Sequence, residues 1–248
     1  MKNKHTEWQI SPSDLTFLWD ECKRCFYLKV VEGIARPSTP MPKIFTILDI
    51  LSKNYFSGKS VSEISPDLPD GTVVFGEKWV ASNTITLPGH ESSFYFRGKF
   101  DSLIKFADSS YGVIDFKTSK PKPEHVSFYS RQLHAYAYAL ENHAPGSLSL
   151  KPVSKLGLLY IEPVSLENVG QDQTAYMVNV TWQECPKDDL AFLDFLSDVL
   201  TVLESPTPPA ASPNCKFCQY SETIKHYQTP SFTPALQDCK VFPACGTY

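Results

Sequence analysis

Apolar residues recur every three to four positions in four segments of the chain, which is the spacing of an amphipathic helix. This spacing predicts helices over residues 12–31, 44–56, 127–141 and 186–204. Ser11 and Pro12 supply a favoured N-cap and first position for the first of these helices. We expect Gly33 and Pro37 to end it.

Shorter segments alternate apolar and polar residues with the period of a β-strand. They predict strands over residues 73–80, 83–87, 94–104, 111–117, 156–161 and 176–181, the first two as a hairpin. Strands and helices are interleaved along the chain, and we find no internal repeat. The expected fold class is therefore α/β, with a mixed central β-sheet flanked by helices.

A proline-rich stretch divides the chain near its C-terminal end. Residues 205–213 read SPTPPAASP, a composition that favours an extended linker. We therefore predict a main domain over residues 1–204, a linker over residues 205–213, and a cysteine-containing tail over residues 214–248.

Composition narrows the class of protein. Of the 248 residues, 42% are hydrophobic and 13% aromatic, which indicates a folded chain with a sizeable core. No apolar stretch approaches the length of a membrane span, and the first residues lack a secretory pattern, so we expect a cytoplasmic protein. A net charge of −4 argues against nonspecific coating of nucleic acid. It leaves room for a local basic groove that holds one strand.

The candidate catalytic residues lie in the predicted pair of strands around the turn at residues 107–110. Two strands joined by a turn would bring Asp101 and Asp115 to neighbouring points on one sheet. Asp115 and Lys117 share a face of their strand, whereas Phe116 points the other way. Carboxylate oxygens are the ligands that Mg²⁺ prefers. The alternative is a surface hairpin whose charged residues are merely solvated. The apolar residues around Asp115 argue against it, because an unpaired carboxylate is costly in such surroundings.

The ordered set of motifs here resembles the PD-(D/E)XK nuclease superfamily, and most closely its RecB-like branch, which includes the CRISPR-associated exonucleases. The chain has Gly-x-x-Asp at residues 98–101, Asp-x-Lys-Thr at residues 115–118 and Gln-x-x-x-Tyr at residues 132–136. The resemblance implies a restriction-endonuclease-like core. It also implies a metal-dependent DNA nuclease, exonuclease-like, that acts in DNA repair, recombination or defence on single-stranded DNA or duplex ends.

The resemblance also assigns roles to single residues. Asp101, Asp115 and the backbone carbonyl of Phe116 would hold Mg²⁺ or Mn²⁺. Lys117 would position the attacking water and stabilise the charged phosphate. Gln132 would orient Lys117 or the scissile phosphate.

Three further residues have two interpretations each. Asp49 stands where many relatives have a metal-binding histidine, and it is either an oxygen ligand or a solvated helix residue. Tyr136 either stacks on a base or packs in the core. Arg131, with Lys120 and Lys122 nearby, either follows the nucleic-acid backbone or is ordinary surface charge.

The sequence is also compatible with a second function, that of a nucleic-acid-binding or structural subunit. A catalytically quiet chain could bind nucleic acid, or serve as a structural subunit of a helicase–nuclease assembly together with a helicase or other repair and defence proteins. The intact set of Asp101, Asp115 and Lys117 argues for activity. No Gly-x-x-x-x-Gly-Lys-Ser/Thr segment is present, so an unwinding motor would have to be another polypeptide.

Cysteine usage predicts a second metal site. Four of the seven cysteines form two Cys-x-x-Cys pairs, and in a cytosolic chain such pairs point to a metal before a disulfide. We favour a site formed by Cys22, Cys25, Cys215 and Cys218. In an alternative one-plus-three set, Cys239 replaces Cys25. Several RecB-like nucleases carry a four-cysteine 4Fe-4S cluster, so the resemblance favours such a cluster over Zn²⁺. Cys185, Cys239 and Cys245 are expected to be free thiols.

Overall fold

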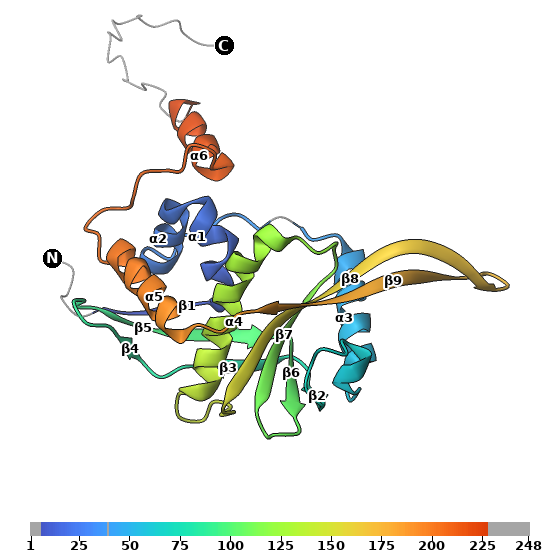
Figure 1. Cartoon of the computed structure of the whole chain (residues 1–248). Coiled ribbons are helices and arrows are strands. Elements are labelled where there is room, and N and C mark those ends of the chain that lie inside the picture. The colour runs from blue at the N-terminus through green and yellow to red at the C-terminus, as the bar shows by residue number, and fades with distance from the viewer. Residues whose placement is uncertain (1–5, 39, 228–248) are drawn as a thin grey trace, which may run out of the picture.

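The structure is a computed structural model and describes residues 6–38 and 40–227 (Figure 1). Its strands are β1 (Glu7–Ile10), β2 (Gly71–Phe75), β3 (Lys78–Ala81), β4 (Ile85–Thr86), β5 (Ser93–Phe100), β6 (Ser102–Phe106), β7 (Tyr111–Lys117), β8 (Val153–Gly170) and β9 (Gln173–Cys185). Its α-helices are α1 (Phe17–Glu21), α2 (Lys23–Val31), α3 (Lys43–Phe56), α4 (Val126–Glu141), α5 (Asp189–Leu203) and α6 (Lys216–Tyr227). Short 3-10 helices cover Pro12–Leu15, Val61–Glu63 and Pro123–His125.

The main sheet has the strand order β2-β6-β7-β8-β9. Strands β7 and β8 run parallel, with α4 as the crossover between them, and the other neighbours are antiparallel. A second sheet places β5 between β1 and β3, and β4 also pairs with β5. The predicted mixed α/β architecture is therefore confirmed.

Two hydrophobic cores lie on opposite faces of the main sheet. Strand β7 shows the alternation, since Val113 packs in the core that α4 and α5 cover, whereas Ile114 packs in the core that contains Phe56 of α3. Successive side chains of a strand point to opposite faces, so β7 needs apolar partners on both sides. This central strand carries Asp115 and Lys117.

The predicted hairpin over residues 73–87 is wrong. Strand β2 pairs with β6 in the main sheet, whereas β3 and β4 pair with β5 in the second sheet. Val73 is buried in the α3-side core, whereas Val80 and Ile85 are buried in the α4-side core. The strands pair with distant strands, and each of these side chains is buried in the core that its sheet covers.

Other predicted bounds also change. The helix expected over residues 12–31 is interrupted at Thr16 and Cys22, where the backbone leaves the helical region. The strand expected over residues 94–104 is divided at Asp101 between the two sheets. Strands β8 and β9 continue beyond the sheet as a long hairpin (Figure 1).

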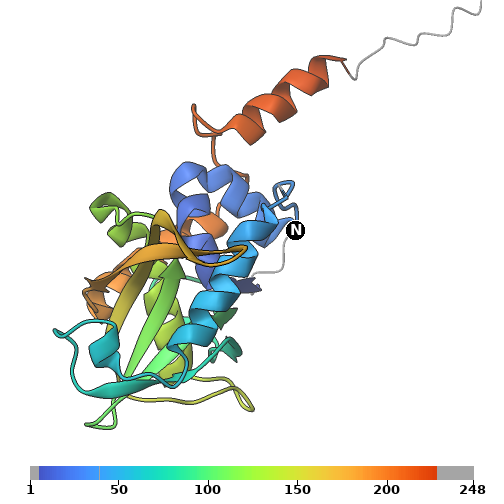
Figure 2. The same ribbon diagram turned by 90° about the vertical axis from the view of Figure 1, so that its right-hand side faces the viewer.

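The C-terminal part of the described chain adds a helix that the sequence pattern did not predict. Helix α6 follows the proline-rich stretch and lies beside the region of α1 and α2, away from the sheets (Figures 1 and 2). Within residues 6–38 and 40–227, no helix combines the length and the apolar character that crossing a bilayer requires.

Candidate active site and cysteine cluster

The two aspartates meet because of strand register. Ser102 of β6 pairs with Ile114 of β7, so a continuation of this antiparallel register by one residue sets Asp101 opposite Asp115. Asp101 occupies the bend where the chain passes from β5 in one sheet to β6 in the other. Its Oδ2 accepts a hydrogen bond of 3.0 Å from the backbone N–H of Phe116. The carboxylate is thereby anchored to the neighbouring strand.

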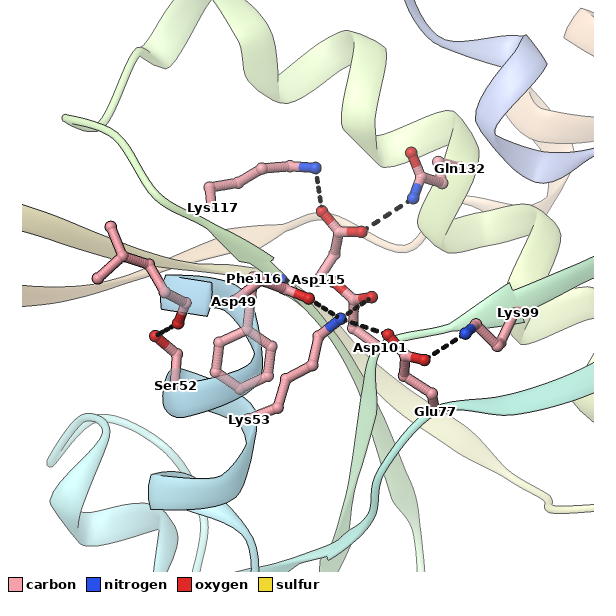
Figure 3. A network of polar contacts seen from close by, with 11 residues as sticks. Asp49, Ser52, Lys53, Glu77, Lys99, Asp101, Asp115, Phe116, Lys117 and Gln132 are labelled. Atoms are coloured by element: carbon pink, nitrogen blue, oxygen red, sulfur yellow. Dashed lines mark hydrogen bonds and ion pairs between the residues drawn. The ribbon is translucent and has the colours of Figure 1, made fainter. Parts of the chain in front are cut away.

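Asp115 is buried on the side of the sheet that α4 covers. Its Oδ1 accepts a hydrogen bond of 2.9 Å from the side-chain amide of Gln132, and its Oδ2 forms an ion pair with Lys117 (Figure 3). Burial raises the pKa of Asp115 above its usual value, and the charge of Asp101 adds to this, although Lys117 opposes it. This carboxylate therefore gains from every positive charge that comes near it.

Lys117 lies on the same face as Asp115, as strand alternation predicts. Its ammonium is 3.9 Å from the centre of the Tyr129 ring. Burial by itself disfavours the charged lysine, but the Asp115 carboxylate outweighs this effect and the pKa of Lys117 is raised. Lys117 is thus held as an ammonium between a carboxylate and an aromatic face. The Phe116 side chain faces the other core and packs against Phe56, with ring centres 6.0 Å apart.

Lys53 of α3 contacts Asp101 and two further carboxylates. Its Nζ lies 2.9 Å from Asp101 Oδ1, 2.7 Å from Asp49 Oδ2 and 2.8 Å from Glu77 Oε1 (Figure 3). Glu77 lies in the turn between β2 and β3 and also pairs with Lys99 of β5. Asp49, for which a metal ligand was one of two interpretations, therefore reaches the site through an ammonium group that it shares with Asp101.

Sequence reasoning missed Lys53, Glu77 and Tyr129. Lys53 follows Asp49 by four residues on one helix, a spacing that places the two side chains side by side, so this contact had a local signal. Glu77 had none, because it meets Lys53 only when β2 and β3 join different sheets. Tyr129 lies one turn before Gln132 on the same helix, and only the path of α4 across β7 brings it onto Lys117.

Gly98, the first residue of the Gly-x-x-Asp motif, is required by close packing. A Cβ atom at this position would lie 2.7 Å from Pro12 Cδ and 3.1 Å from the Tyr136 ring. Tyr136 is buried, and its hydroxyl donates a hydrogen bond of 2.8 Å to the Lys99 carbonyl. Both residues thus fix the strand that leads into Asp101, and Tyr136 takes the core position that was one of its two interpretations.

Arg131 lies outside the cluster of aspartates. Its guanidinium forms an ion pair of 2.7 Å with Asp20 and stacks over the Phe195 ring at 4.5 Å. These contacts attach α4 to α1 and α5. Lys120 and Lys122 follow β7 in the loop before α4.

The side chains present fit a hard divalent cation. Asp101 and Asp115 offer carboxylate oxygens, the ligands that Mg²⁺ prefers, at adjacent points of two paired strands.

The four cysteines of the two Cys-x-x-Cys pairs come together in a separate buried cluster. Cys22 is the N-cap of α2 and Cys25 lies in the first turn of that helix, while Cys215 precedes α6 and Cys218 lies in its first turn. The positive end of each helix dipole therefore points at a pair of sulfurs, although burial raises the pKa of Cys25 and of Cys218. The interruption of the predicted first helix at Cys22 has the same origin, because an extended Cys22 turns its sulfur toward its three partners.

The sulfur atoms are close enough to share one centre. All four lie within 4.8 Å of one another, with contacts of 3.6 Å from Cys25 to Cys215 and to Cys218 and of 3.8 Å from Cys22 to Cys218. Burial opposes the Cys22 thiolate, but backbone N–H groups, including that of Ser212, lower the pKa of Cys22 to about 7. A guanidinium from Arg36 lies 3.5 Å from Cys215 Sγ and adds positive charge beside the cluster.

The remaining cysteines have different positions. Cys185 ends β9, is buried away from the cluster, and is a free thiol as predicted; burial raises its pKa to about 12. Cys239 and Cys245 lie outside the described residues. Within the described chain the two-plus-two set of cysteines is thus the one that the fold assembles.

Comparison with known proteins gives one family match. The family model of the PD-(D/E)XK nuclease superfamily matches residues 61–223, a range that contains Asp101, Asp115, Lys117 and Gln132. No curated protein matches the chain significantly. Among solved structures, the crystal structure of SSO0001 is similar over 80% of this chain and 78% of its own, with 17% sequence identity and a TM-score of 0.45. With the family match spanning most of the chain and its motif residues gathered at one site, this protein belongs to the PD-(D/E)XK nuclease superfamily.

Proposed function

We propose that this protein is a Mg²⁺- or Mn²⁺-dependent DNA nuclease of the RecB-like branch that hydrolyses phosphodiester bonds in an exonuclease-like manner. Family membership supports nuclease chemistry, and members of this family typically depend on a divalent metal ion. The observation that carries the proposal is the position of Asp101, Asp115 and Lys117 at adjoining points of two paired strands, with Gln132 on Asp115.

In this proposal Asp101 and Asp115 hold the cation, and the Phe116 carbonyl supplies a further oxygen. Asp49 is the remaining oxygen donor, and its carboxylate is engaged by Lys53. When bound, the cation would lower the pKa of a water molecule and neutralise charge that develops on the phosphate. Burial raises the pKa of Asp115, which means that its negative charge is costly in the absence of a cation. A bound cation would remove this cost.

Lys117 and Gln132 have distinct tasks. The Lys117 ammonium has three N–H donors, of which one is directed at Asp115, so the others can hold the attacking water and a phosphate oxygen. As the water oxygen attacks phosphorus and the bond to the leaving sugar oxygen breaks, the fixed ammonium stabilises the added negative charge. Gln132 holds the Asp115 carboxylate in one orientation and is a positioning residue.

The substrate would be single-stranded DNA or duplex ends, in DNA repair, recombination or defence. A helicase or another repair or defence protein is the expected kind of partner. The cysteine cluster would hold the segment that contains α6 against α2 by binding a metal centre, with a structural role. The family resemblance favours a 4Fe-4S cluster. Three of the six sulfur–sulfur distances, 3.6 to 3.8 Å, lie near the edge of about 3.8 Å expected for a tetrahedron of sulfurs 2.3 Å from a single Zn²⁺, which supports that alternative.

The test is cleavage of end-labelled single- and double-stranded DNA by the full chain, purified without oxygen and assayed with Mg²⁺ or Mn²⁺. Asp115→Ala and Lys117→Ala should each abolish cleavage. Asp108→Ala and Lys105→Ala are matched controls, because these exposed residues belong to the same two-stranded segment but lie outside the site. The controls should cleave like the wild type.

Two results would contradict the proposal. Cleavage that survives in Asp115→Ala would come from elsewhere or from a contaminant. A folded wild-type chain with its cysteine site filled that binds DNA without cleaving it would favour the nucleic-acid-binding module. Iron, sulphide and zinc analysis of the same preparation distinguishes the two metal centres.

A further inference from the structure

Lys53 places its ammonium among three carboxylates of the site. Its ammonium contacts one oxygen each of Asp49, Glu77 and Asp101 at 2.7 to 2.9 Å, and its side chain is only 12% exposed. The three carboxylates surround this ammonium and together compensate its charge.

The charges of the site leave little room for two divalent ions. Four carboxylates, those of Asp49, Glu77, Asp101 and Asp115, face three ammonium groups, those of Lys53, Lys99 and Lys117. One net negative charge remains. A single divalent cation reverses it, and a second would add two more positive charges next to three ammonium groups.

From this we infer that Lys53 takes the place of a second divalent cation, so that the active site binds one metal ion and uses the lysine ammonium as its other fixed positive charge. The inference rests on the proposed function and adds a further residue to it. The single ion would use Asp101 and Asp115. Lys53 already supplies a positive charge to Asp49 and Glu77, the two carboxylates that the single ion would not use (Figure 3).

The experiment counts bound Mn²⁺ by electron paramagnetic resonance and by calorimetry, with the full chain and its cysteine site filled. A variant with both Asp101→Asn and Asp115→Asn gives the number of ions bound elsewhere. Wild type should bind one ion above this background. Lys53→Met should bind two, and its first ion should bind at least about tenfold more tightly because a nearby positive charge is gone.

Two more variants control the result. Lys59→Met removes a lysine that pairs with Glu63 and contacts the Tyr55 ring outside the site, and it should bind one ion with unchanged affinity. Lys53→Arg keeps the positive charge and should also bind one ion. It keeps the test informative if Lys53→Met does not fold, as judged by circular dichroism.

Several outcomes would overturn the inference. These are two ions in wild type, one ion in folded Lys53→Met, or two ions in Lys53→Arg. If wild type instead binds no more Mn²⁺ than the double aspartate variant, the proposed metal site fails together with this inference. If wild type binds one ion and cleaves DNA but Lys53→Met also binds one, only the role of Lys53 is refuted.

Discussion

Replacement of Lys117 by methionine should destabilise the fold by an amount that depends strongly on pH. The substitution keeps an apolar chain of similar length but removes the ammonium that pairs with buried Asp115. Breaking one partner out of a buried ion pair typically costs about 3–5 kcal/mol. Here the cost has an upper limit, because Asp115 can take up a proton instead of remaining charged without a partner.

That limit follows from the pKa of a free aspartate, 3.8. Keeping a carboxyl with this value protonated costs about 1.36 kcal/mol for each pH unit above it, hence about 4.4 kcal/mol at pH 7 and about 1.6 kcal/mol at pH 5. Asp115 already has a raised pKa in the folded wild type, so it binds more protons folded than unfolded above pH 3.8. Its contribution to stability therefore falls as pH rises through that window, and the loss of Lys117 steepens the fall.

The assay is urea unfolding of wild type and Lys117→Met at pH 5 and pH 7, without added divalent cation. Subtracting the free energy of unfolding of the variant from that of the wild type at each pH cancels the contributions of the other titrating groups. We expect a loss of several kcal/mol at pH 7 that shrinks to about 1.6 kcal/mol or less at pH 5. A chain with both Asp115→Asn and Lys117→Met should lose this pH dependence. Equal losses at both pH values would refute the claim that Asp115 is the source of the penalty.

Two other predictions concern packing and the cysteine cluster. Gly98→Ala should lower the free energy of unfolding in urea by about 1–3 kcal/mol, because its methyl group would press on Pro12. Gly76→Ala has open space around it and should be nearly neutral, and equal effects would mean that the Pro12 contact is unimportant. Cys215→Ser should lose the metal centre in elemental analysis, whereas Cys185→Ser should keep it, because Cys215 belongs to the cluster and Cys185 does not. Full metal content in Cys215→Ser would argue against a four-thiolate site.

The sequence predicted those features whose causes are local. Alternation along residues 111–117 places Asp115 and Lys117 on one face, and the structure shows their ion pair there. Helical spacing over residues 127–141 predicted α4 within one residue at its start. The cysteine pairs had the short spacing that two ligands of one centre need, and the fold joins them.

Features that depend on partners far away in the chain were not predictable in the same way. The segment around residues 73–87 has the pattern of a hairpin, yet its strands enter two sheets because their apolar residues belong to different cores. Cys22 lies in a helical pattern, yet it interrupts the helix because its sulfur meets Cys218, 196 residues away. In both places long-range burial outweighs local propensity.

The same division holds for the site. The order and spacing of its motif residues fixed their identity and, through the period of the strand and the helix, the faces they share. Only the tertiary structure decided what surrounds them, since Lys53, Glu77 and Asp101 come from a helix, a turn and a bend between sheets. Their meeting is determined by how these elements pack, and electrostatic compensation of buried carboxylates is a property of that packing.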